Sequence, residues 1–303
     1  MAISRQQLAK ELEPGLNALF GLEYNSYENQ HAEIFDTETS DRAFEEEVML
    51  GGFGEAAVKA EGSAVAFDSA NESFTARYTH ETIALAFSIT EEAVEDNLYD
   101  SVAKRYTKAL ARSMAQTKQI KAANILNNAF SVTTVSGDKQ FLIDNDPPTI
   151  GGGNQTNRPT TLADLSETSL EQAMIDIAAF KDERGLKIAA RGMKLIVPSA
   201  NQFNAERILK SNQRVGTSDN DINALSSKGM LPQGYVVNNF LTDSDAFFIK
   251  TDVPNGLKHF QRAALKTAME GDFDTGNMRY KARERYSFGA SDWRGIYGSD
   301  GSA

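Results

Sequence analysis

The feature that most constrains the fold is a long helical pattern that nothing interrupts. Residues 89 to about 130 contain no Pro or Gly, and apolar residues recur every four positions from Val94 to Met114. At about 1.5 Å per residue, a helix of this length spans about 60 Å. The pattern favours a flat, elongated subunit with this segment as its spine. A coiled coil is the alternative, although a strict four-residue step lacks the heptad's alternation of three and four.

Charge is segregated around this segment. The first 100 residues contain 21 Asp/Glu and 5 Lys/Arg, a formal charge of −16, whereas residues 101–137 contain no acidic residue. The helical pattern carries the bases Lys104, Arg105, Lys108, Arg112, Lys118 and Lys121. An acidic arm and a basic rod suit association between copies, because complementary surfaces steer and register binding.

We therefore expect contacts between subunits that join two sets of residues. The acidic set is Glu45, Glu46, Glu47, Glu55 and Glu61, and the basic set is Lys104, Arg105, Lys108 and Arg112. Two alternatives remain for the basic set: weak contacts with DNA phosphates that lack sequence preference, or an ordinary solvated helix face.

The segment ahead of the helix predicts an arm and a hairpin. Residues 1–43 lack sustained periodicity and predict an arm with at most a short helix. In residues 44–88 we expect two strands around a polar tip, because large and small side chains alternate along residues 82–89. Gly51, Gly52 and Gly54 indicate a bend or bulge in the first strand. A hairpin with this many acidic residues is expected to project from the body of the protein.

The remainder predicts a connection, a compact unit and a returning tail. Residues 135–163 are rich in Pro and Gly and predict an irregular connection after the spine helix, which is placed at 89–134. Residues 164–275 predict an α/β unit, with a helix near 170–178, strands at 193–197, 235–241 and 246–249, and a polar loop at 211–228. Residues 276–303 predict strands and turns, because residues 280–288 alternate.

Composition excludes several classes of function. The 303 residues include no Cys, so disulfides, thiolate catalysis and Cys-based metal sites are impossible. No apolar run reaches the roughly 20 residues of a membrane span, and residues 1–12 lack a signal-peptide core. A net charge of −11 argues against sequence-specific DNA binding. His31, His80 and His259 lack metal-ligand spacing, and neither a nucleophile elbow nor a phosphate-binding loop is present. We expect neither an enzyme nor a cofactor.

The order of these segments resembles the major capsid protein of tailed bacteriophages with the Hong Kong 97 fold. The similarity covers about residues 40 to 298. It rests on three stretches: 78–82 (YTHET) leading into 86–92 (AFSITEE), 151–157 (GGGNQTN) followed by 165–170 (LSETSL), and 285–295 (RYSFGASDWRG).

The resemblance implies an α+β shell subunit. The spine helix and returning strands would form a peripheral domain, residues 164–275 an axial domain, and residues 44–88 an extended loop reaching over a neighbour. It implies hexamers and pentamers in an icosahedral shell around double-stranded DNA, assembled in the bacterial host cytoplasm as part of the virion. A scaffolding protein, a portal and, in some shells, a decoration protein would be partners.

Departures from the family and rival functions qualify these expectations. The arm begins near Met1, without the scaffolding segment of some members, which implies a separate scaffolding protein unless the chain was trimmed. Lys59 could act in the cross-linking of some members, but the tail offers no convincing Asn partner, and we expect no cross-link.

An encapsulin-like compartment enclosing a cargo enzyme is the alternative function. A soluble α/β enzyme would need a catalytic cluster that the sequence does not show.

Overall fold

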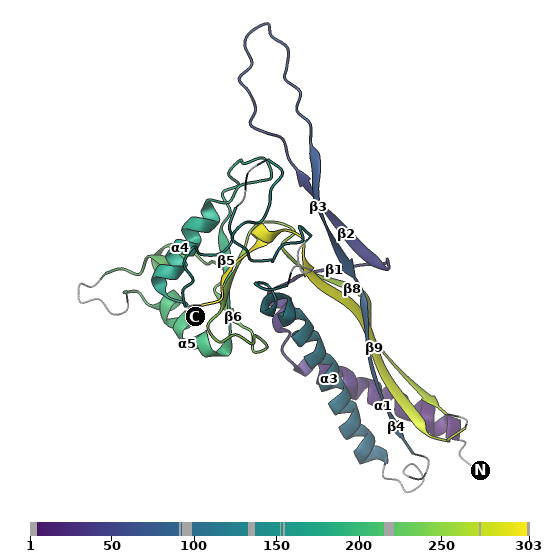
Figure 1. Ribbon diagram of the computed structural model, residues 1–303. Helices are drawn as coiled ribbons and strands as arrows, with labels where there is room; N and C mark the ends of the chain where they lie inside the picture. Colours follow the sequence, from purple (N-terminus) through teal and green to yellow (C-terminus); the bar gives the residue numbers. More distant parts are fainter. Residues whose placement is uncertain are drawn as a thin grey trace.

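The computed structural model describes residues 5–90, 92, 99–132, 137–151, 153, 155–214, 221–272 and 274–301. It has an α+β architecture, as predicted. Figure 1 shows three parts: an elongated body of helices and long strands, a compact α/β body beside it, and a hairpin that projects away from both.

The spine helix is α3 (Tyr99–Asn127). Its predicted start cannot be compared, because residues 91 and 93–98 lie outside the described residues and β4 runs as far as Ile89. Along the four-residue stripe, Leu110 and Met114 are buried but Tyr106 is 53% exposed, because a step of four over-rotates on a 3.6-residue turn. The buried residues of the helix form a band with neighbours three and four positions apart: Ala103, Thr107, Leu110, Ala111, Met114, Ala115, Lys118, Gln119, Ala122, Ala123 and Leu126. Residues at these spacings share one side of a helix with 3.6 residues per turn, so this band faces the rest of the body.

A four-stranded sheet lies against α3. Its order is β1 (Asp36–Thr39), β8 (Leu257–Gly271), β9 (Met278–Ala290) and β4 (Glu81–Ile89). β1 is parallel to β8, and the other neighbours are antiparallel. The predicted alternation along β9 is confirmed, because Tyr280, Ala282, Glu284 and Tyr286 are all buried.

The prediction of at most a short helix in the arm is wrong. Helix α1 spans Arg5–Ser26, 22 residues with Pro14 inside, and a 3-10 turn, η1 (Gln30–Glu33), follows it. Leu16 and Phe20 are buried with Leu110 and Met114 of α3. A weakly amphipathic sequence can form a long helix when tertiary packing stabilises it, and local periodicity does not reveal that packing.

The hairpin is shorter than predicted. β2 (Phe44–Gly51) pairs with β3 (Asn71–Thr79), and residues 52–70 between them form neither helix nor strand. The predicted continuous second strand is divided at His80, after which β4 pairs with β9 in the body. His80 is buried at this break: its Nε2 lies 2.9 Å from Ser40 Oγ and its Nδ1 lies 3.0 Å from Ser287 Oγ. These contacts fix the point where the chain passes from the hairpin into the body.

The compact body is a second four-stranded sheet with helices. Its strand order is β10 (Ile296–Ser299), β7 (Phe247–Thr251), β5 (Gly192–Val197) and β6 (Tyr235–Val237). Its helices are α4 (Glu167–Ala178), η2 (Ser199–Asn201), α5 (Gln202–Lys210) and α6 (Ala224–Lys228), with η3 (Trp293–Gly295) before β10. Helix α6 lies inside the predicted polar loop, whose residues 215–220 are outside the described part.

The two bodies exchange strands in a way that the sequence did not predict. β8 was expected inside the α/β unit at 164–275, but it pairs with β9 in the spine-side sheet. β10 was expected with the returning strands of the tail, but it pairs with β7 in the compact body. The described residues of the connection, 137–151, 153 and 155–163, contain no helix or strand, as predicted.

Candidate assembly surfaces

No catalytic or metal centre is visible in the described residues. They contain no group of three or more His, Asp or Glu placed to hold a metal ion. Within the same ranges, no helix combines the length and apolar character needed to cross a membrane. The three histidines are buried among polar and aromatic neighbours. The candidate functional sites are therefore surfaces of the molecule.

The acidic residues at the base of the hairpin have partners in their own chain. Glu45 accepts a hydrogen bond of 2.7 Å from Ser40 Oγ, and Glu46 lies 3.5 Å from Arg77. Glu47 pairs with Lys258 and accepts a hydrogen bond from the Ser291 hydroxyl. These contacts tie β2 and β3 to each other and to the body, and a contact of the same three acids with another subunit stays a prediction.

Two of the five predicted acids lie elsewhere. Glu55 and Glu61 are exposed on the hairpin loop, residues 52–70, and neither forms an ion pair within the part of the chain described here. Their contact with another subunit stays a prediction, because it cannot be tested in a single chain.

The predicted basic set lies together on the exposed side of α3. Lys104, Arg105, Lys108 and Arg112 all face solvent. Lys108 Nζ is 3.6 Å from Glu23 Oε2 of α1, so part of the arm's negative charge already neutralises this helix within the chain. With more than half of the Lys108 side chain exposed, this pair contributes little stability.

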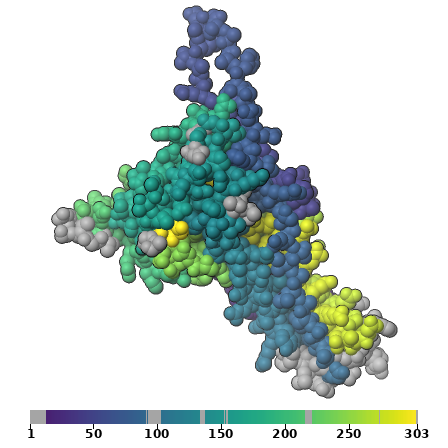
Figure 2. Space-filling view, viewed as in Figure 1, coloured from purple at the N-terminus to yellow at the C-terminus, as the bar shows by residue number. Residues whose placement is uncertain are grey.

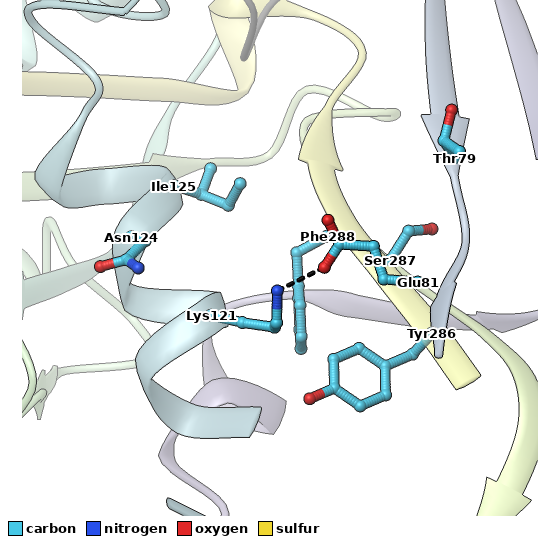
Figure 3. Close-up of a pocket in the computed structure, with 8 residues that line it drawn as sticks. All are labelled: Thr79, Glu81, Lys121, Asn124, Ile125, Tyr286, Ser287 and Phe288. Atoms are coloured by element: carbon cyan, nitrogen blue, oxygen red, sulfur yellow. Dashed lines mark hydrogen bonds and ion pairs between the residues drawn. The ribbon is translucent and has the colours of Figure 1, made fainter. Parts of the chain in front are cut away.

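The other two bases of the helical pattern do not share this surface. Lys121 forms an ion pair with Glu81 at the start of β4. Figure 3 shows this pair beside a cavity of about 210 Å³, where Lys121 and Ile125 of α3 lie near Phe288 of β9. Lys118 is buried, and its Nζ lies 3.4 Å from Glu284 Oε2. Both lysines therefore fasten the helix to the sheet.

A buried polar junction connects the arm, the spine helix and the sheet. The His31 backbone N–H donates to Gln119 Oε1 at 3.0 Å, which fixes the amide orientation. Gln119 Nε2 then lies 2.9 Å from His31 Nδ1, so the amide donates and the imidazole accepts. The His259 ring stands edge-on to His31 at 5.4 Å and stacks on Phe288 at 4.4 Å.

Burial sets the ionisation of this junction. Desolvation, with a smaller effect from the Lys118 charge, lowers the pKa of His31 to about 4 and that of His259 to about 3. Desolvation raises the pKa of Glu284, whose Oε2 also accepts a hydrogen bond of 3.3 Å from the Tyr24 hydroxyl. This junction was not predicted from the sequence, in which its one signal is the acidic Glu284 on the buried parity of β9.

The hairpin loop exposes large apolar side chains. Val58 and Phe67 are 99% and 98% exposed, and Phe53 and Val65 are also exposed. Figure 2 shows the loop standing clear of the rest of the surface. Exposed apolar side chains gathered on one projecting segment are typical of a surface that a partner covers.

Buried charges hold the base of the hairpin against the compact body. Arg294 donates from Nη2 to Glu183 Oε1 at 3.0 Å and from Nε to Asp292 Oδ1 at 2.9 Å. Glu183 Oε2 accepts from Ser73 Oγ of β3 at 3.3 Å. Nearer the loop, Arg184 binds Asp68 at 3.2 Å. The direction in which the hairpin projects is thus fixed by residues of the compact body.

Comparisons with known proteins agree with this geometry. A family model described as "phage capsid protein" matches residues 73–299. The structure is similar to the capsid of cyanophage P-SCSP1u, with a TM-score of 0.57 and 10% identity over 88% of this chain and 85% of that one. It is similar to the capsid of an empty GTA particle (TM-score 0.53, 13% identity, 91% of each chain). It is also similar to a virus-like particle from Pyrococcus furiosus (TM-score 0.50, 11% identity, 94% of this chain and 97% of that one). No curated protein sequence matches the chain.

Proposed function

Since this chain belongs to the phage capsid protein family, we propose that it is the major capsid subunit of a tailed phage and closes into an icosahedral shell of hexamers and pentamers around double-stranded DNA. The observation that carries this proposal is the family match over residues 73–299. The elongated body and the projecting hairpin support it, because they suit a subunit that overlaps its neighbours (Figure 1).

The parts of the fold have distinct roles in this proposal. The body of α1, α3 and the four-stranded sheet is the peripheral domain. The compact body around β5 and β7 is the axial domain at the centre of each capsomer, with residues 211–228 near its axis. The hairpin is the extended loop. A separate scaffolding protein, a portal, in some shells a decoration protein, and non-specifically contacted DNA would complete a virion that is assembled in the host cytoplasm.

Neighbouring subunits would be held together through the hairpin. We place Glu55 and Glu61 of one copy near the exposed bases of α3 in the next copy: Lys104, Arg105, Lys108 and Arg112. Glu45, Glu46 and Glu47 belong to the same acidic set, although each also has a partner within its own chain. Each contact can be weak, since many simultaneous contacts stabilise a closed shell.

A compartment that encloses a cargo enzyme is the second candidate function. The observation that favours it is the similarity to the Pyrococcus furiosus particle, which covers 94% of this chain and 97% of that one. At 11% identity this likeness shows the fold alone.

The first experiment is expression of the chain alone and with co-expressed candidate scaffolding proteins, followed by electron microscopy of the purified material. Shells or capsomers support the proposal, and a protein that stays monomeric at low salt in both conditions contradicts it. The double variant Arg105→Glu/Arg112→Glu is expected to fold, by circular dichroism, but to assemble poorly. Nuclease-protected DNA in particles from infected cells would separate the phage shell from the cargo compartment, which would retain a protein instead.

A further inference from the structure

The outer strand of the spine-side sheet has an unusual edge. β4 pairs with β9 on one side, and among the described residues no strand pairs with its other side. After Glu81, residues 82–90 contain no charged residue and no Pro. Soluble proteins usually protect such an edge with Lys, Pro, a bulge or a covering segment, because a long uncharged edge pairs with other chains. An uncharged edge over residues 82–89 of this strand indicates that assembly covers it.

The surface beside this edge is apolar. Ile83 and Phe87 of β4 pack against the cluster formed with α1 and α3. Leu85 lies on the same face and is 46% exposed. The Tyr106 ring of α3 lies 5.8 Å from the Phe87 ring and is also half exposed. Leu85 and Tyr106 therefore leave an uncovered apolar patch, where one more strand would bury both side chains.

The hairpin loop has the complementary pattern. In residues 63–70, Val65 and Phe67 share one parity and alternate with Ala64 and Ala66. This is the pattern of a strand with one apolar face, yet the segment pairs with no strand within the described chain. Figure 1 shows this arm of the loop running to the tip as an extended trace.

The two surfaces cannot meet within one copy. In Figure 1 the loop and β4 lie at opposite ends of the elongated structure, and β3 leads directly from one to the other. We infer that residues 63–70 of a second copy add to the edge of β4 as a fifth strand and place Val65 and Phe67 over Leu85 and Tyr106. This inference rests on the proposed function and names the edge and the main-chain pairing by which the loop engages its neighbour.

Charge and symmetry agree with this arrangement. Glu61 precedes the added strand and Arg105 adjoins Tyr106, and both are exposed, so the two surfaces carry opposite charges beside their apolar residues. Because one end of each subunit binds the other end of the next, the contact is head-to-tail. Such contacts close into rings when the rotation between copies permits, as hexamers and pentamers require.

Disulfide trapping tests the pairing, because the chain contains no Cys. Ala66→Cys is combined in turn with Ala84→Cys, Ala86→Cys and Ser88→Cys on β4, whose side chains face the same side as Ala66 in the paired arrangement. The matched control combines Ala66→Cys with Ala268→Cys on β8, which shares that sheet face but lies two strands away. A strand spacing of about 4.8 Å puts the control pair beyond the roughly 7 Å that a disulfide spans.

We expect oxidation of assembled shells to give a ladder of covalent oligomers for at least one β4 position and none for the control. Shells that form normally but show no ladder, or a ladder with Ala268→Cys alone, overturn the inference and leave the proposed function standing. Failure of the unaltered chain to assemble contradicts the proposed function instead.

Hydrogen exchange gives a second measurement, which uses the unaltered chain and so does not depend on the folding of any variant. Amides of residues 63–70 and 82–88 should both become protected when subunits assemble, with exchange at least tenfold slower. Rapid exchange of residues 63–70 in assembled shells overturns the pairing.

Discussion

Acidification should weaken the junction between the arm, the spine helix and the sheet. His31 and His259 are buried there at 5% and 2% exposure, and Lys118 adds a positive charge beside them. In the folded chain, His31 Nδ1 accepts a hydrogen bond from Gln119 and His259 Nδ1 lies 3.2 Å from Thr37 Oγ1. A second proton on either ring would place a cation in this pocket, and on His31 it would also break the bond to Gln119.

The magnitude follows from the two pKa values. They fall from 6.5 to about 4 for His31 and to about 3 for His259 in the folded chain. Below pH 6.5 the unfolded chain therefore binds protons that the folded chain does not, and stability falls as the pH falls. Because each histidine of the unfolded chain is already half protonated at pH 6.5, lowering the pH from 6.5 to 5 should cost about 1.6 kcal/mol per histidine and about 3 kcal/mol for both.

Other titrating groups act differently in this range. The raised pKa of Glu284 works in the opposite direction, because its proton is favoured by the folded chain as the pH falls. Burial lowers the pKa of His80, with smaller effects from Arg285 and Arg262, so His80 adds to the loss. The lowered pKa of Asp68 matters only below the ordinary range of a carboxyl group. Between pH 6.5 and 5, Glu284 therefore offsets part of the loss caused by the histidines.

Urea denaturation of unassembled subunits at pH 7.5, 6.5 and 5.0 measures this effect. The unaltered chain should lose up to about 3 kcal/mol between pH 6.5 and pH 5.0, and His259→Phe, which keeps a ring stacked on Phe288, should lose about half as much. Lys281→Gln on the exposed side of β9 is the control and should follow the unaltered chain. An equal loss in the His259→Phe variant would refute the assignment, as would no loss in the unaltered chain.

Three further substitutions test the energetics of buried groups. Lys118→Met alone should lower the free energy of unfolding, measured in urea, by about 3 to 5 kcal/mol, because Glu284 then stays buried without its cation. Adding Glu284→Leu to this variant should recover most of that loss. Gly295→Ala should lower the free energy of unfolding, measured by thermal denaturation, by about 2 kcal/mol, because the added Cβ overlaps with the Gly256 backbone. Gly271→Ala should change it little, because nothing lies within 4 Å of a Cβ at that position. Asn157→Ala should cost about 3 kcal/mol by calorimetry, because the fully buried amide donates to three backbone carbonyls.

Periodicity predicted the elements whose neighbours are close in sequence or whose pattern is strict. The long helix, the alternation of β9 and the short strand at Gly192–Val197 all follow from local apolar spacing. The helix predicted near 170–178 is α4 (Glu167–Ala178), where the Ser166 side chain caps the helix by accepting from the Ser169 backbone N–H. These features depend on short-range geometry, which can be predicted from the spacing of residues in the sequence.

The missed features depend on pairing across long separations. β8 lacks clean alternation, because bulges interrupt its register near Ala263 and Lys266. The length of α1 depends on burial of Leu16 and Phe20 beneath a helix almost 100 residues later. Among the candidate site residues, Glu45, Glu46 and Glu47 could be recognised as charged and exposed in a hairpin, but their partners Ser40, Arg77 and Lys258 could not be known before the strands were paired.

The in-chain pairing of these three acids changes the expected response of assembly to salt. If exposed charges held neighbouring subunits together, assembly would fail above a few hundred millimolar NaCl, because the Debye length falls to about 3 Å at 1 M. An added strand at β4 depends instead on main-chain hydrogen bonds and on burial of Val65, Phe67 and Leu85, and sulfate strengthens apolar burial. We therefore expect NaCl to slow assembly without abolishing it, and ammonium sulfate at equal ionic strength to promote it, both measured by light scattering. Equal inhibition by the two salts would show that charge contacts dominate and that the edge of β4 does not set the strength of the interface.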